Sequence, residues 1–108
     1  MVYATDHEHA RRIDRKLVAL SQETDLLIHD AQYTEAEYTG LAGPSRCGWG
    51  HSCWDEAAQT AVMSGATRLA LFHHDPMRSD DGVAAIEEEA RGLFPGSFAA
   101  REGRRVAL

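Results

Sequence analysis

The chain has 108 residues, of which 44% are hydrophobic and 26% are charged. These values are close to those of an average soluble globular domain, so they exclude a disordered, collagen-like or long coiled-coil protein. There are 17 acidic and 11 basic residues, which gives a formal net charge of -6. This acidic balance argues against a protein that grips nucleic acid through a broad basic surface.

The sequence has no apolar run of the about 18 residues that a membrane span needs. Its first residues, Met1–Asp6, lack the basic start and apolar stretch of a signal peptide. We therefore expect a cytoplasmic protein without a membrane partner, folded as a single domain over residues 1–108. The two cysteines, Cys47 and Cys53, are too few for a disulfide framework.

The first quarter of the chain predicts a strand, a helix and a second strand. Val2–Thr5 is β-leaning and runs into the polar loop Asp6–His9. Apolar residues recur at helical spacing between residues 10 and 20, which predicts a helix that packs on a sheet. The continuous apolar run Leu26–Ile28 is typical of a strand covered on both faces, and His29-Asp30 follows it.

The middle of the chain predicts a long loop between two helical segments. Thr34–Glu37 resembles a capped helical turn, and residues 39–50 contain four glycines and a proline, as a loop does. A second helix is expected from Ser52, acting as the N-cap, to Gly65 as the stop. The small alanines on its apolar face imply close packing.

The last third predicts one more strand and helix, followed by short extended segments. Leu69–Phe72 is another buried-strand run, and it ends in His73-His74-Asp75. Ser79 is expected to cap a helix that ends at Pro95-Gly96. Residues 98–100 and 105–107 suggest a terminal hairpin or two short edge strands.

This order of elements predicts an α/β fold with at least part of its sheet parallel. Ligands of such sheets bind outside the carboxyl ends of the strands. That rule places three polar clusters on one rim of the sheet: Asp6-His7, His29-Asp30 and His73-His74-Asp75. Imidazole nitrogens and carboxylate oxygens are ligands of divalent metals, so the three clusters together favour a metal site over simple loop starts.

Residues 47–53 allow further interpretations. His51, between flexible glycines and a helix start, is placed to contact an oxyanion, with a local loop tether as the alternative. A structural zinc site of Cys47, His51 and Cys53 is disfavoured, because their spacing matches no familiar zinc pattern. A Ser52 nucleophile is rejected, because the sequence has no G-x-S-x-G elbow.

The pair His7-x-His9 mimics a metal motif. The residues at positions 10 to 12 add no further ligand. We therefore expect His9 to lie in a solvated loop.

Three ordered motifs carry a resemblance to a known family. They are Asp25-Leu-Leu-Ile-His-Asp-Ala-Gln-Tyr33, Gly48-Trp-Gly-His-Ser52 and Leu71-Phe-His-His-Asp-Pro76 with Ser79-Asp-Asp81. Together they closely resemble the C-terminal half of metallo-β-lactamase-fold hydrolases, in the branch of ribonuclease Z and phosphodiesterase-like enzymes. The likeness extends from Tyr3 to Gly103. It implies half of an αββα sandwich, with a mixed sheet and flanking helices.

The resemblance also implies roles for individual residues. Asp30 matches an aspartate that bridges two metal ions, and His73 matches the last histidine ligand of the second metal. His51 matches a catalytic residue that contacts the scissile phosphate and assists the leaving group. His74 and Asp75 match positions that orient the metal ligands. The complete site implied in this way holds two divalent ions, with zinc expected and manganese or iron as alternatives.

The sequence departs from the family in one large respect. The H-x-H-x-D-H motif, which provides most ligands of both metals, is absent from this chain. We therefore expect the chain to be part of a binuclear hydrolase that needs an N-terminal half for activity. The acidic charge favours a small phosphodiester over bulk RNA as substrate.

The alternative is a non-catalytic α/β interaction or oligomerisation module. Half a sandwich leaves one sheet face uncovered, and we expect that face to bind the missing half or a second copy. The residues predicted to lie on it are Leu26, Ile28, Leu69 and Leu71.

Overall fold

The computed structural model describes residues 1–10 and 12–107 and has an α/β fold. Its sheet contains β1 (Val2–Ala4), β2 (Leu27–Asp30), β3 (Leu69–Phe72) and β4 (Ser97–Ala99), in this spatial order. All neighbouring strands in the described sheet are parallel. The α/β class and the flanking helices are confirmed, whereas the sheet is parallel rather than mixed.

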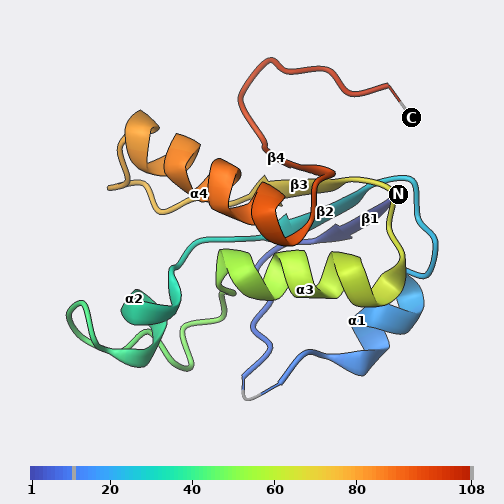
Figure 1. The fold of residues 1–108 in the computed structure, drawn as a ribbon. Coiled ribbons are helices and arrows are strands. Elements are labelled where there is room, and N and C mark those ends of the chain that lie inside the picture. The colour runs from blue at the N-terminus through green and yellow to red at the C-terminus, as the bar shows by residue number, and fades with distance from the viewer. Residues whose placement is uncertain (11, 108) are drawn as a thin grey trace.

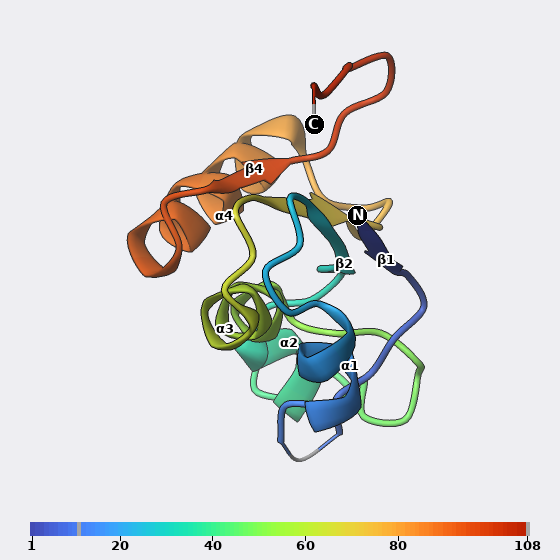
Figure 2. The same ribbon diagram turned by 90° about the vertical axis from the view of Figure 1, so that its right-hand side faces the viewer.

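Helices connect the strands, as parallel pairing requires. They are α1 (Arg15–Leu20), α2 (Glu35–Thr39), α3 (Trp54–Ser64) and α4 (Asp80–Leu93). In Figures 1 and 2, α1 and α3 lie on one side of the sheet, and the segment after β4 runs over the other side. None of the helices in the described ranges has the length and apolar composition that a bilayer crossing requires.

Capping residues set most of the helix boundaries that the sequence predicts. Thr34 forms a full capping box with Glu37 at the start of α2, and Ser79 caps α4 by accepting from the amide of Gly82. Gly65 ends α3 in the left-handed conformation, with φ of 70°. Such a φ costs glycine little, because it has no Cβ.

Three boundary predictions were wrong. The first helix begins at Arg15 rather than near residue 10, because Asp14 is its N-cap. The N-cap of α3 is Cys53 and not Ser52, whose hydroxyl donates to the backbone oxygen of His7 instead. Residues 98 and 99 belong to β4, but residues 105–107 form no strand, so no terminal hairpin is present in the described chain.

The main core lies between the sheet and the helices. Leu27, Leu69 and Leu71 are fully buried there against the alanines of α3 and against Ile86 and Ala90 of α4. The expectation that Leu69 and Leu71 lie on the uncovered face was wrong, because side chains alternate along a strand and these two point toward the helices. The alanines allow α3 to approach the sheet closely, as predicted.

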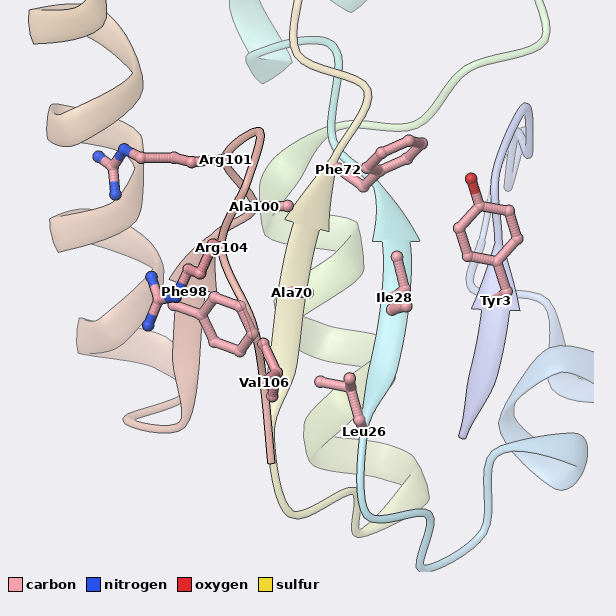
Figure 3. Close-up of a pocket in the computed structure, with 10 residues that line it drawn as sticks. All are labelled: Tyr3, Leu26, Ile28, Ala70, Phe72, Phe98, Ala100, Arg101, Arg104 and Val106. Atoms are coloured by element: carbon pink, nitrogen blue, oxygen red, sulfur yellow. The ribbon is translucent and has the colours of Figure 1, made fainter. Parts of the chain in front are cut away.

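Among residues 1–10 and 12–107, no helix covers the opposite face of the sheet. Leu26 and Ile28 lie on this face, as expected, together with Ala70 of β3 and Phe98 of β4. Figure 3 shows these side chains around one pocket, crossed at one side by the C-terminal segment that carries Val106. Elsewhere the face is open: in the same view, Phe72 stands at its upper edge and Tyr3 at its right-hand edge, with Tyr3 56% exposed.

A chain of buried histidines joins β2 to the loop after β1. His29 Nδ1 lies 2.7 Å from the backbone oxygen of Asp30, and that oxygen can only accept, so Nδ1 carries a proton. His29 Nε2 therefore accepts from His9 Nε2, 2.9 Å away, while His9 Nδ1 accepts from the amide of Asp14 at 2.9 Å. Each ring is neutral and has one defined tautomer.

Burial opposes a charge on either ring. It lowers the pKa of His9 and that of His29 to about 4. Their position also corrects the expectation that His9 lies in a solvated loop, since its side chain is only 6% exposed.

The histidine chain makes stability depend on pH. In the unfolded chain both imidazoles titrate near their ordinary pKa of about 6.5, so between pH 6.5 and 4 the unfolded state binds more protons. We expect the free energy of unfolding to be highest above pH 6.5 and to fall as the pH drops toward 4, by about 2–3 kcal/mol for each of the two rings. Urea unfolding at pH 7 and pH 4.5 measures this loss.

The matched variant is His9→Gln, which removes one of the two titrating rings. It should lose less stability between the two pH values than the unaltered chain does. An equal loss in both proteins would show that other groups cause the acid sensitivity.

Candidate metal and phosphate site

Four side chains from separate segments meet at the carboxyl edge of the sheet. They are Asp6 after β1, Asp30 at the end of β2, His51 before α3 and His73 after β3, and each offers a ligand atom within 4.8 Å of the others. Three of these segments leave parallel strands at the same edge, which is why they meet. The structure thus brings the predicted residues His51, Asp30 and His73 together. Asp6 of the predicted Asp6-His7 cluster joins them, whereas His7 is not part of the group in the described residues.

Asp30 is the buried member of the group. Its Oδ1 accepts from the amides of Gln32 at 3.2 Å and Ser52 at 3.3 Å, and its Oδ2 accepts from His51 Nδ1 at 2.7 Å. The side chain has no exposed area. Because the carboxylate can only accept, His51 carries its proton on Nδ1 and keeps Nε2 available for another partner.

Asp6 and His73 form the accessible part of the site. Asp6 Oδ1 lies 3.3 Å from His73 Nε2, and the two side chains are 67% and 37% exposed. The His73 ring stacks on the His51 ring, with centroids 4.6 Å apart and an angle of 27° between the planes. Both Asp6 (φ 49°) and His73 (φ 61°) have left-handed backbone conformations, which are uncommon for residues with a Cβ and are concentrated at functional sites.

Glu8 fixes the loop that carries His51. Its Oε2 accepts from Tyr38 Oη at 2.5 Å and from the amide of Gly48 at 2.7 Å, and its Oε1 accepts from the amide of Gly50 at 2.8 Å. Burial disfavours a charge on Glu8, but these hydrogen bonds outweigh it and hold the pKa of Glu8 below its usual value. The loop 46–51 is therefore tied to the segment that also carries Asp6.

Two glycines in this loop make the hydrogen bonds to Glu8 possible. Gly48 and Gly50 have φ of 85° and 86°, a conformation that allows both amides to face the Glu8 carboxylate. In the structure they bring the backbone close to a side chain of the protein itself.

Other residues of the predicted clusters lie outside this group. His74 has no hydrogen-bond partner for either ring nitrogen among the described residues and lines a different pocket with Asp80 and Arg101. Asp75 accepts from the amide of Met77 and so stabilises its own turn. No hydrogen bond in the described chain joins His74 or Asp75 to the four-residue group, so their role in orienting metal ligands stays a prediction.

The two cysteines take no part in the described metal-ligand group. Cys53 is buried, with its sulfur 3.7 Å from the backbone oxygen of Thr34, and Cys47 is exposed beside Tyr38. Burial raises the pKa of the Cys53 thiol, so it is protonated at neutral pH and is a poor metal ligand. These observations agree with the low weight given to a zinc site of Cys47, His51 and Cys53.

The donor set suits part of a metal centre. Carboxylate and imidazole groups bind zinc, manganese and iron. Asp6 and His73 present accessible donor atoms, whereas three bonds already engage the Asp30 oxygens. Two accessible donors are fewer than the three protein ligands that are usual for a catalytic zinc site. The residues therefore fit a centre whose other ligands come from another part of the protein or from a partner.

Sequence comparison finds relatives that are named ribonuclease Z. The chain is 36% identical over 91 residues to ribonuclease Z of Gemmatimonas aurantiaca, covering 84% of this chain and 27% of that protein. It is 40% identical over 90 residues to ribonuclease Z of Salinibacter ruber, covering 83% of this chain and 26% of the relative. For ribonuclease Z of Ignicoccus hospitalis, the identity is 32% over 108 residues, covering all of this chain and 32% of the relative.

The chain therefore spans about a third or less of the length of these curated relatives. No family model matches the sequence.

Structural comparison agrees on the fold. The metallo-β-lactamase fold protein YhfI from Bacillus subtilis superposes with a TM-score of 0.69 and 24% identity, over 94% of this chain and 37% of that one. By the sequence relatives and this fold together, the chain resembles a C-terminal part of the ribonuclease Z-like proteins of the metallo-β-lactamase fold.

Proposed function

We propose that this chain is the C-terminal part of a metal-dependent phosphodiester hydrolase. The observation that carries the proposal is the meeting of Asp6, Asp30, His51 and His73 within 4.8 Å at the sheet edge. The relatives are named ribonuclease Z, so the substrate class we propose is an RNA phosphodiester. This replaces the sequence-based expectation of a small phosphodiester, which rested on net charge alone.

In the proposed centre, Asp6 and His73 hold the metal ions. Their side chains are accessible, and Asp6 Oδ1 already faces His73 Nε2. When bound, divalent metals supply Lewis-acid activation of water and of the phosphoryl group. The remaining ligands would come from the N-terminal half with its H-x-H-x-D-H motif, and two ions, with zinc as the expected metal, would complete the site.

His51 acts on the phosphate in this proposal. The Asp30 carboxylate holds Nδ1 at 2.7 Å and can balance the charge of an imidazolium, so Nε2 can hold or deliver a proton at the leaving oxygen. Glu8 and Ser52 keep the backbone on both sides of His51 in place. The geometry thus favours Asp30 as the hydrogen-bond acceptor that orients His51. The role of Asp30 as a ligand that bridges two metal ions stays a prediction.

The covering half is proposed to pack on the open sheet face. Tyr3, Ile28 and Phe72 present an apolar surface there, beside the buried Leu26. A sheet face of this kind is stable when a second layer buries it. A non-catalytic module that dimerises through the same face is the alternative, and the experiments below separate the two.

The first prediction from this proposal concerns the metal ligands. In the purified chain, Asp6→Asn and His73→Gln should each weaken zinc binding at least about tenfold, because each removes one ligand atom of an already incomplete set. Isothermal titration with zinc measures the affinity. Asp25→Asn, an exposed aspartate before β2, is the matched control and should bind as the unaltered chain does.

This experiment also tests Asp30. If Asp30→Asn abolished zinc binding while Asp6→Asn left it unchanged, Asp30 would be the ligand and our assignment of Asp6 would be wrong. If none of the substitutions changed zinc binding, the proposed metal site would be wrong.

The second prediction concerns His51. A chimera in which this chain replaces the matching part of Salinibacter ruber ribonuclease Z supplies the missing half. In this chimera, His51→Ala should lower the turnover of RNA cleavage by about 10²–10⁴-fold, the usual contribution of a general acid or base. Its metal content, measured by elemental mass spectrometry, should not change.

A full rate after His51→Ala would contradict the proposed role. Loss of metal together with activity would instead make His51 a ligand. An inactive chimera with an intact metal complement would favour the non-catalytic alternative.

The third prediction concerns the open face. The isolated chain should self-associate at high concentration, because the apolar face of the sheet is accessible to a second copy. The double substitution Tyr3→Glu with Ile28→Glu should make it monomeric in gel filtration with light scattering. The control is Val62→Glu with Met63→Glu, which adds the same charge at exposed apolar positions of α3 and should leave association unchanged.

A strictly monomeric unaltered chain would contradict this prediction. So would equal effects of the two double substitutions.

A further inference from the structure

Gln32 contacts the candidate site through a single side-chain hydrogen bond. Its Oε1 lies 3.0 Å from His73 Nδ1, the ring nitrogen on the side away from Asp6. Gln32 follows the last residue of β2 by two positions, and His73 directly follows β3. The contact therefore joins the ends of two neighbouring strands at the edge where the site lies.

The backbone of Gln32 is held on both sides. Its amide donates to Asp30 Oδ1 at 3.2 Å, and its carbonyl oxygen accepts from Arg78 Nη2 at 2.8 Å. The same Nη2 of Arg78 donates to Glu37 Oε1 at 2.7 Å, which ties this point to α2. The carboxamide thus extends from a fixed point toward His73.

The contact determines where His73 carries its proton. An amide oxygen only accepts, so Nδ1 of His73 must be the donor to Gln32. In a neutral imidazole the other nitrogen, Nε2, then has a free lone pair. Nε2 is the atom that faces Asp6 Oδ1 at 3.3 Å on the accessible side of the site, and this pair lacks the geometry of a hydrogen bond, whereas Nδ1 and Gln32 form one.

The two stacked histidines have partners of different charge. His51 donates to the Asp30 carboxylate, whereas His73 donates to a neutral amide. A carboxylate can balance an imidazolium, which suits a ring that exchanges protons. A neutral acceptor fixes the tautomer without adding negative charge, which suits a ring that serves as a neutral metal ligand.

We infer that Gln32 is a positioning residue that holds His73 in its Nδ1–H tautomer and so keeps Nε2 ready as the metal ligand. This inference rests on the metal site proposed above for its functional meaning. Its structural content, the tautomer of His73, can be measured without any metal.

The experiment uses the full chain labelled with nitrogen-15 and free of metal. Long-range proton–nitrogen NMR spectra report which ring nitrogen of each histidine carries the proton, and His73→Gln identifies the signals of His73. In the unaltered chain His73 should be protonated on Nδ1. Gln32→Leu should shift a large part of the population to the Nε2–H tautomer, because Nδ1 then loses its acceptor and Nε2–H can donate to Asp6.

A second readout is zinc affinity. Gln32→Leu should weaken zinc binding by about 10–100-fold, the usual effect of removing such a supporting hydrogen bond. Gln32→Glu keeps an acceptor oxygen at the same reach, so at a pH where the His73 ring is neutral it should keep the proton on Nδ1 and lose less zinc affinity than Gln32→Leu does. Gln59→Leu, at an exposed glutamine of α3, is the control and should change neither.

Two results would overturn the inference. One is an Nε2–H tautomer in the unaltered chain, which would mean that the amide group of Gln32 is turned to donate to Nδ1. The other is an equal loss in Gln32→Glu and Gln32→Leu, which would show that packing and not the acceptor matters. Failure of the metal site itself would appear separately, as unchanged zinc binding in His73→Gln with the tautomer results intact.

Discussion

The buried carboxylate of Asp30 is the constraint on which the site depends. A charge without solvent contact is costly unless hydrogen bonds replace its hydration. Asp30 obtains these bonds from the amides of Gln32 and Ser52 and from the ring of His51. The chain after β2 must therefore turn at Gln32, and the long loop must return to place residues 51 and 52 beside the strand. Moving the turn at Gln32 would remove one of these three hydrogen bonds, and moving residues 51 and 52 would remove the other two.

The order of strands and helices could be read from the sequence because each element carries its own local signal. Apolar runs marked β2 and β3, and capping residues such as Thr34 and Ser79 marked helix starts. The error at Leu69 and Leu71 arose because a continuous apolar run hides which residues face which side. Ser52 was misread as a cap because a serine before a helix is a common N-cap, while its actual acceptor, the His7 carbonyl, is 45 residues away in sequence.

The site could be predicted only in part, because some of its contacts also join residues that are far apart in the sequence. The rule that ligands gather at the carboxyl ends of parallel strands brought Asp6, Asp30 and His73 to one rim. It could not show which neighbours would separate from them: His29 and His9 pair with each other in the interior instead. No local sequence pattern indicates the roles of Glu8 and Gln32, because their hydrogen-bond partners are about 40 residues distant along the chain.

The edge of the open sheet face lies next to the accessible metal-ligand candidates Asp6 and His73. The rings of Tyr3 and Phe72 lie with centroids 5.6 Å apart at the edge of the open face. Tyr3 precedes Asp6 by three positions, and Phe72 is the residue before His73. A layer that buried these two rings would therefore end beside the accessible donors Asp6 and His73. In the function we propose, the packing that covers the sheet also delivers the remaining metal ligands, so assembly and activity depend on the same interface.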